Sequence, residues 1–74
     1  MSKLPVASGK QLCKVLEKIG YFMDHQTGSH IILRNENPPY CRLTVPDHKE
    51  IAKGTLRSVI RQAGLTVEEF EGIL

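Results

Sequence analysis

Three histidines and two cysteines in this 74-residue sequence could in principle supply ligands for a zinc ion. A structural zinc site takes its ligands in close pairs, and only His25 and His30 stand at such a spacing. No second pair matches them, because Cys13, Cys41 and His48 are isolated. We therefore expect no metal site. A serine hydrolase is not expected either, since the sequence has no GxSxG motif.

His30 is the most suggestive of these residues because it directly follows Gly28 and Ser29 at the start of a predicted strand. Two interpretations stay open. Most histidines at such positions are simply exposed in a hairpin. Alternatively, the imidazole exchanges protons near neutral pH, next to cations that hold a phosphodiester. Arg34, Arg42 and a later helix could supply those cations.

The other histidines and the aromatic residues carry weaker signals. His25 ends a predicted strand and His48 lies in a loop after Pro46, so neither has a functional signature. The aromatic residues are few and scattered, which gives only weak support for a platform on which bases stack. We expect Phe22 and Phe70 to lie in the core, and both cysteines to be small buried residues outside any disulfide.

A first helix is predicted from Ser8, because Ser8 and Gln11 have the spacing of a capping box. An apolar stripe follows with helical periodicity, and Gly20 supplies the left-handed residue that ends the helix. The stripe consists of Leu12, Val15, Leu16 and Ile19, with Lys10, Lys14 and Lys18 turned outward.

Three strands follow, over Tyr21–Gln26, His30–Arg34 and Tyr40–Val45. The turn Thr27–Ser29 joins the first two into a hairpin, and Pro46 ends the sheet. Alternation predicts one sheet face against the helices and one facing water. The covered face takes Ile31, Leu33, Cys41, Leu43 and Val45, while His30, Ile32 and Arg34 stand on the open face.

A second helix is predicted near Lys53, with an apolar stripe and a stop at Gly64. The stripe is Leu56, Val59, Ile60 and Ala63. Arg57 and Arg61 form an outward row suited to phosphates or to the carboxylates of a partner. Thr66 and Glu69 form a second capping box, which opens a short C-terminal helix packed through Phe70, Ile73 and Leu74. The order predicts an α+β fold with one antiparallel sheet covered on one side.

Length and composition limit the function classes. Seventy-four residues suffice for one domain, 1–74, and leave little room for a deep ligand pocket. The formal charge of +2 is compatible with nucleic acid without requiring it. No apolar stretch is long enough to span a membrane, and the N-terminal stretch lacks the apolar run of a signal peptide. We expect a cytoplasmic protein without membrane contact.

Several motifs in this order resemble the HicA toxins of bacterial HicAB toxin-antitoxin systems. The resemblance covers nearly the whole chain and is carried by Ser8-Gly9-Lys10, Gly20 before the first strand, Gly28-Ser29-His30, Thr44-Val45-Pro46 with His48, and the segment from Lys53 to Leu65. Gly-Ser-His alone is a weak signal, whereas its combination with the long second segment is specific. The resemblance implies a fold like that of double-stranded-RNA-binding domains, in the order α-β-β-β-α, and a ribonuclease that cleaves messenger RNA.

The family's catalytic histidine falls on His30, preceded by its Gly28-Ser29. The expected site therefore comprises catalytic His30 and RNA-binding Gly28, Ser29, Lys53, Arg57 and Arg61, with no metal and no cofactor. The expected partners are messenger RNA and a HicB-type antitoxin, which we expect to cover the open sheet face. Many members have a second histidine directly after the first, whereas this chain has Ile31.

Two other function classes stay open at this point. A fold of this kind can hold RNA through phosphates and 2′-hydroxyls without cutting it, so a non-catalytic RNA-binding module is the main alternative. A purely regulatory protein whose basic helix binds an acidic partner is the third.

Overall fold

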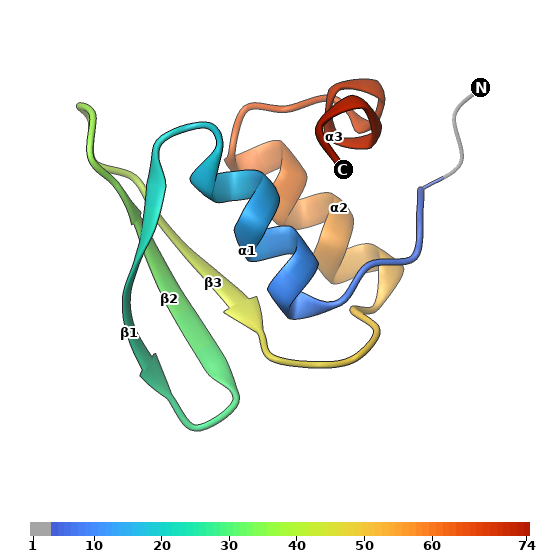
Figure 1. The fold of residues 1–74 in the computed structure, drawn as a ribbon, viewed down its shortest axis with the longest axis horizontal. Coiled ribbons are helices and arrows are strands. Elements are labelled where there is room, and N and C mark those ends of the chain that lie inside the picture. Colours follow the sequence, from blue (N-terminus) through green and yellow to red (C-terminus); the bar gives the residue numbers. More distant parts are fainter. Residues whose placement is uncertain (1–3) are drawn as a thin grey trace.

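One three-stranded antiparallel sheet and a layer of helices on one of its faces make up the computed structural model (Figure 1). The structure describes residues 4–74; residues 1–3, part of the N-terminal stretch considered for a signal peptide, lie outside the described residues. The elements are α1 (Gly9–Glu17), β1 (Tyr21–Thr27), β2 (His30–Asn35), β3 (Arg42–Pro46), α2 (Lys53–Gln62) and α3 (Val67–Ile73). This order confirms the predicted α+β architecture, with its α-β-β-β-α pattern and short C-terminal helix.

Helix α1 begins where the capping box predicts. The Ser8 hydroxyl accepts a hydrogen bond from the Gln11 amide at 3.1 Å, and the Gln11 side chain accepts one from the Ser8 amide at 2.8 Å. These bonds satisfy two amides that the first helical turn leaves without partners. Gly20 follows the helix with φ +101°, a conformation that side chains with a Cβ rarely adopt.

The apolar stripes of the helices meet the covered face of the sheet in a single core. From the sheet, Ile31, Leu33, Leu43 and Val45 are buried, as alternation predicts. Helix α3 closes the core with Phe70, whose side chain has no exposed surface, and begins with the predicted capping box of Thr66 and Glu69. The helical members of this core are Leu12, Val15 and Leu16 of α1 and Leu56, Val59 and Ile60 of α2.

Four local expectations are wrong. Strand β3 begins at Arg42 rather than Tyr40, because Tyr40 follows Pro38-Pro39 with φ +59°, which strand geometry excludes. Cys41 therefore precedes the strand and is exposed instead of buried. Phe22 is 41% exposed, because Tyr21 takes the inward position at this end of β1. Leu74 is half exposed, since α3 has already ended at Ile73.

The start of α1 packs directly on the chain that leaves β3. The Gly9 amide donates a hydrogen bond to the His48 carbonyl at 2.9 Å. A Cβ atom added at Gly9 would overlap the Pro46 carbonyl oxygen, which belongs to the rigid backbone. The Ile51 amide also donates to the Ala7 carbonyl at 2.9 Å. Position 9 therefore accepts only glycine unless the backbone moves.

Within residues 4–74, none of the helices combines the length and the apolar character that crossing a membrane requires.

The contact at Gly9 gives a prediction about stability. We expect Gly9→Ala to lower the free energy of unfolding by about 2 kcal/mol, because overpacking against backbone forces the helix away from β3. For a domain of this size that corresponds to a fall of roughly 10 °C in melting temperature, measured by circular dichroism. The matched control is Gly54→Ala in α2, where the new methyl group meets open space and should leave stability equal or slightly higher. Equal melting temperatures for the two variants would contradict the close packing at Gly9.

Candidate active site

His30 stands on the open face of the sheet, as the alternation predicts. Its strand neighbours Ile31 and Leu33 point into the core, with 6% and 0% of their surfaces exposed, so His30, Ile32 and Arg34 point the other way. His30 is exposed and lies opposite Thr27 of β1 and Pro46 of β3. It thus occupies the middle strand next to the hairpin turn.

The hairpin turn beside His30 is fastened to the segment after β3. The Ser29 carbonyl accepts a hydrogen bond from the Asp47 amide at 2.7 Å, and the Gly28 carbonyl accepts one from the Gln26 side chain at 3.0 Å. The same Gln26 amide donates to the Asp47 carboxylate at 3.2 Å. Gly28 has φ +58°, which explains the glycine in this tight turn. Backbone contacts therefore fix the position of His30 relative to the rest of the fold.

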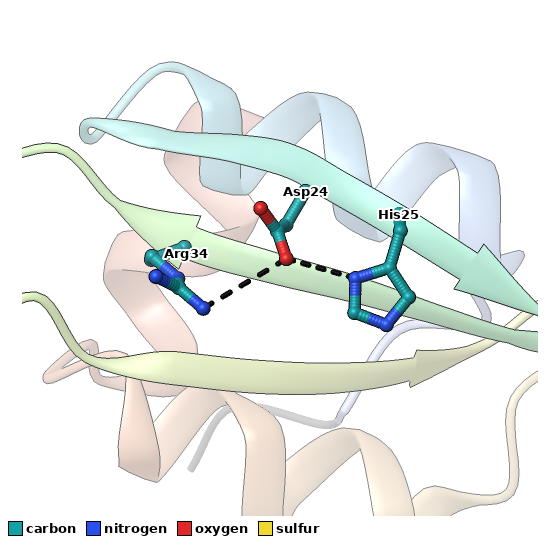
Figure 2. A network of polar contacts seen from close by, with 3 residues as sticks. All are labelled: Asp24, His25 and Arg34. Carbon is teal, nitrogen blue, oxygen red and sulfur yellow. Dashed lines mark hydrogen bonds and ion pairs between the residues drawn. The ribbon is translucent and has the colours of Figure 1, made fainter.

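A β-bulge places two consecutive polar residues on the same open face. The register between β1 and β2 shifts between Met23 and His25, so Asp24 is the extra residue of β1. Figure 2 shows the Asp24 side chain between Arg34 of the neighbouring strand and His25. The Asp24 carboxylate is 2.8 Å from His25 Nδ1 and 3.8 Å from an Arg34 guanidinium nitrogen.

The charges of this network keep Asp24 ionised. The hydrogen bond from His25 lowers the pKa of the Asp24 carboxyl most, and the nearby Arg34 and Arg42 guanidinium groups lower it further. An ionised carboxylate only accepts hydrogen bonds, so His25 Nδ1 carries the proton in this pair. The other ring nitrogen, Nε2, is then the acceptor in the neutral imidazole.

Two arginines face each other across the open face. Arg34 of β2 lies directly opposite Arg42 of β3, and Phe22 of β1 lies opposite Arg34 on the other side. Like charges in directly opposed positions destabilise a sheet, and the Asp24 carboxylate pairs with Arg34. A row of an exposed aromatic ring and two guanidinium groups matches what a single-stranded nucleic acid needs, a stacking surface and phosphate ligands.

The basic row of α2 lies in the other layer. Arg57 and Arg61 are exposed, because the opposite side of α2 packs into the core through Leu56, Val59 and Ile60. Lys53, at the start of the helix, is exposed as well. Since α2 covers the closed face of the sheet, the structure does not bring this row onto the open face with His30 (Figure 1).

The cysteines and the other potential metal ligands are candidates for a metal centre, and Cys13 for a nucleophile. Within the described residues, no three histidine, cysteine, aspartate or glutamate side chains are grouped as metal ligands. Burial, reinforced by the nearby Glu17 and Asp47, raises the pKa of the Cys13 thiol to about 11. Cys13 therefore stays a protonated thiol near neutral pH, which suits packing and not nucleophilic attack.

The pairing of Asp24 with His25 could not be predicted from the sequence. A regular strand would place these two residues on opposite faces, and the bulge that places them together leaves no composition signal. Their adjacency in the sequence, one carboxylate before one imidazole, is the only available hint. Arg34 and Arg42, which the sequence suggested as cations for His30, share its open face but lie opposite each other four residues further along β2.

Comparison with protein families identifies a match over most of the chain. A family model described as the HicA toxin of bacterial toxin-antitoxin systems matches residues 9–65, which run from the first residue of α1 to just beyond α2. The match covers more than half of the chain and includes the whole sheet. No curated protein matches the chain.

Proposed function

The chain belongs to the HicA toxin family of bacterial toxin-antitoxin systems, and from this premise we propose that it is an endoribonuclease toxin that cleaves messenger RNA. The observation that supports this most directly is the exposed imidazole of His30, on a sheet face that also holds Arg34 and Arg42. An imidazole exchanges protons near neutral pH, and guanidinium groups stabilise the charge of a phosphodiester. The proposed catalytic residue is His30.

The proposed chemistry uses the nucleophile that RNA already contains. The 2′-hydroxyl attacks the adjacent phosphorus, and His30 transfers a proton to or from one of the reacting oxygens. Cationic groups stabilise the additional negative charge of the transition state. This route requires neither a metal ion nor a cofactor.

The proposed RNA-binding residues lie in three places. Gly28 and Ser29 form the exposed turn next to His30, where the backbone permits a close approach of the RNA strand. Arg34, Arg42 and Phe22 extend the site along the open face. Lys53, Arg57 and Arg61 offer phosphate or carboxylate ligands from α2, on a separate surface. A long RNA or an antitoxin could contact that second surface.

The first prediction tests the nuclease and its histidine. We expect the purified protein to cut RNA in the presence of EDTA, and a 2′-deoxy substitution at the cleavage site to prevent the cut. His30→Ala should lower the rate about 100- to 10,000-fold, because it removes a proton-transfer group. Its melting temperature should stay unchanged, since His30 is exposed.

Two outcomes of that experiment would contradict the proposal. Activity lost in EDTA and restored by a divalent metal would replace the histidine mechanism with metal chemistry. If the wild-type protein binds RNA but never cuts it, the non-catalytic RNA-binding module is the better interpretation.

The second prediction distinguishes the two basic surfaces by their salt dependence. Arg34→Gln with Arg42→Gln should reduce the slope of log K against log salt concentration by about 1.4, which is roughly 0.7 for each phosphate contact on single-stranded RNA. The matched pair is Arg57→Gln with Arg61→Gln on α2, which we expect to weaken RNA or antitoxin binding. If the double substitution at Arg57 and Arg61 changes neither the affinity for RNA nor the affinity for the antitoxin at low salt, these arginines are simply on a solvated helix face.

The third prediction concerns inhibition by a HicB-type antitoxin, the partner we propose for this toxin. A stable interface covers roughly 800 Å² of each partner, and the described chain exposes 4875 Å² in all. The core is too thin to transmit a distant conformational change, so the antitoxin should cover the open face and His30 directly. A structure of the complex tests this. An antitoxin that abolishes cleavage but leaves His30 accessible would contradict direct coverage.

A further inference from the structure

The Asp24–His25 pair is the best organised polar group on the open face, and the reaction described above does not use it. Its two side chains share the face only because of the bulge in β1, and bulges in sheets commonly redirect side chains at functional sites. His25 Nδ1 is 2.8 Å from the Asp24 carboxylate, while about half of the His25 side chain remains exposed (Figure 2). The carboxylate thus orients a ring that is still open to a ligand.

We propose that His25 is a second catalytic residue, the general base of the cleavage reaction, with Asp24 as its positioning residue and His30 as the general acid. This inference rests on the proposed ribonuclease function and adds to it a division of roles. An ionised Asp24 holds the proton of His25 on Nδ1, so that the lone pair is on Nε2, which points away from Asp24 (Figure 2). A carboxylate that orients a histidine in this way is a recurrent arrangement for general bases.

The strand register places the two histidines on either side of one potential substrate position. His25 lies opposite Ile32, and His30 lies two residues before Ile32 on the same strand, so the histidines are diagonal neighbours. Diagonal neighbours on one face of an antiparallel pair lie roughly 7–8 Å apart, within reach of each other for long side chains. Two hydrogen bonds of about 2.8 Å each leave space between the rings for the oxygens of one phosphodiester.

The proposed reaction balances without a co-reactant. His25 Nε2 takes the proton of the 2′-hydroxyl while the O2′–phosphorus bond forms. The phosphorus–O5′ bond breaks, and the protonated His30 gives its proton to the departing O5′. The products are a 2′,3′-cyclic phosphate and a 5′-hydroxyl, and proton exchange with water returns both imidazoles to their starting states.

A substrate with sulfur in place of the bridging O5′ separates the two roles. A thiolate leaves without being protonated, because a thiol is far more acidic than an alcohol, so a variant lacking only the general acid should be rescued by it. We expect His25→Ala and His30→Ala each to lower cleavage of ordinary RNA about 100- to 10,000-fold. The sulfur substrate should restore the His30→Ala variant to near the wild-type rate and leave His25→Ala slow.

The outcomes distinguish this inference from the proposed function. Wild-type protein that cuts RNA alongside an equally fast His25→Ala variant overturns the role of His25 and leaves the nuclease intact. Rescue of His25→Ala by the sulfur substrate, without rescue of His30→Ala, overturns the assignment of base and acid. Wild-type protein that cuts neither substrate overturns both proposals together.

The positioning role of Asp24 is tested by a separate measurement. In Asp24→Asn the carboxamide no longer requires a proton on His25 Nδ1, so the ¹⁵N NMR shifts of the His25 ring should move toward the other tautomer, with a fall in rate of at least about tenfold. The matched control is Glu36→Gln, which removes one exposed carboxylate from the loop after β2. It should change neither the His25 ring shifts nor the cleavage rate. Unchanged His25 shifts in Asp24→Asn would overturn the positioning role, whatever the rate.

Discussion

The covering of one sheet face, and one only, is the constraint on which the rest of this structure depends. A short chain makes one apolar interface, and here it lies between the three strands and the helices. The buried residues of β2 and β3 are all apolar, so the register of the sheet cannot slip by one residue without exposing the core. The same register fixes which side chains face outward. Because Ile31 and Leu33 must point into the core, the alternation along β2 turns His30 toward water.

The outward face is organised less well for stability than for contact with an anion. Two arginines oppose each other there, an aromatic ring is exposed beside them, and the Asp24 carboxylate that pairs with Arg34 also contacts His25. An exposed ion pair at 3.8 Å contributes little to folding. Groups that destabilise a fold slightly, and that combine cations with an exposed ring, fit the proposed RNA-binding surface better than a structural role. The bulge at Asp24 has a similar effect. It interrupts the hydrogen bonds between β1 and β2, and it turns the Asp24 carboxylate toward the open face.

One end of the molecule joins the core to the site. Gly9 brings the start of α1 against the Pro46 carbonyl, and Pro46 lies beside His30 in the sheet. The Asp47 amide then holds the turn through Ser29. These contacts hold the start of α1, the end of β3 and the hairpin turn together. Helix α3 lies outside the family match, yet its Phe70 is completely buried and completes the core that supports this end.

The sequence by itself determined the element order, both capping boxes, the covered and open faces of β2, and the exposed position of His30, because local periodicity and cap chemistry depend on residues within a few positions of each other. Tertiary structure alone decided the rest. The turn of the chain at Tyr40 moved Cys41 out of the sheet, and Tyr21 rather than Phe22 filled the core. The α2 arginines lie in a different layer from His30, which requires knowing where the helix packs. Above all, the bulge that puts Asp24 and His25 on one face arises from pairing between strands, and no single strand contains the information about its partner's register.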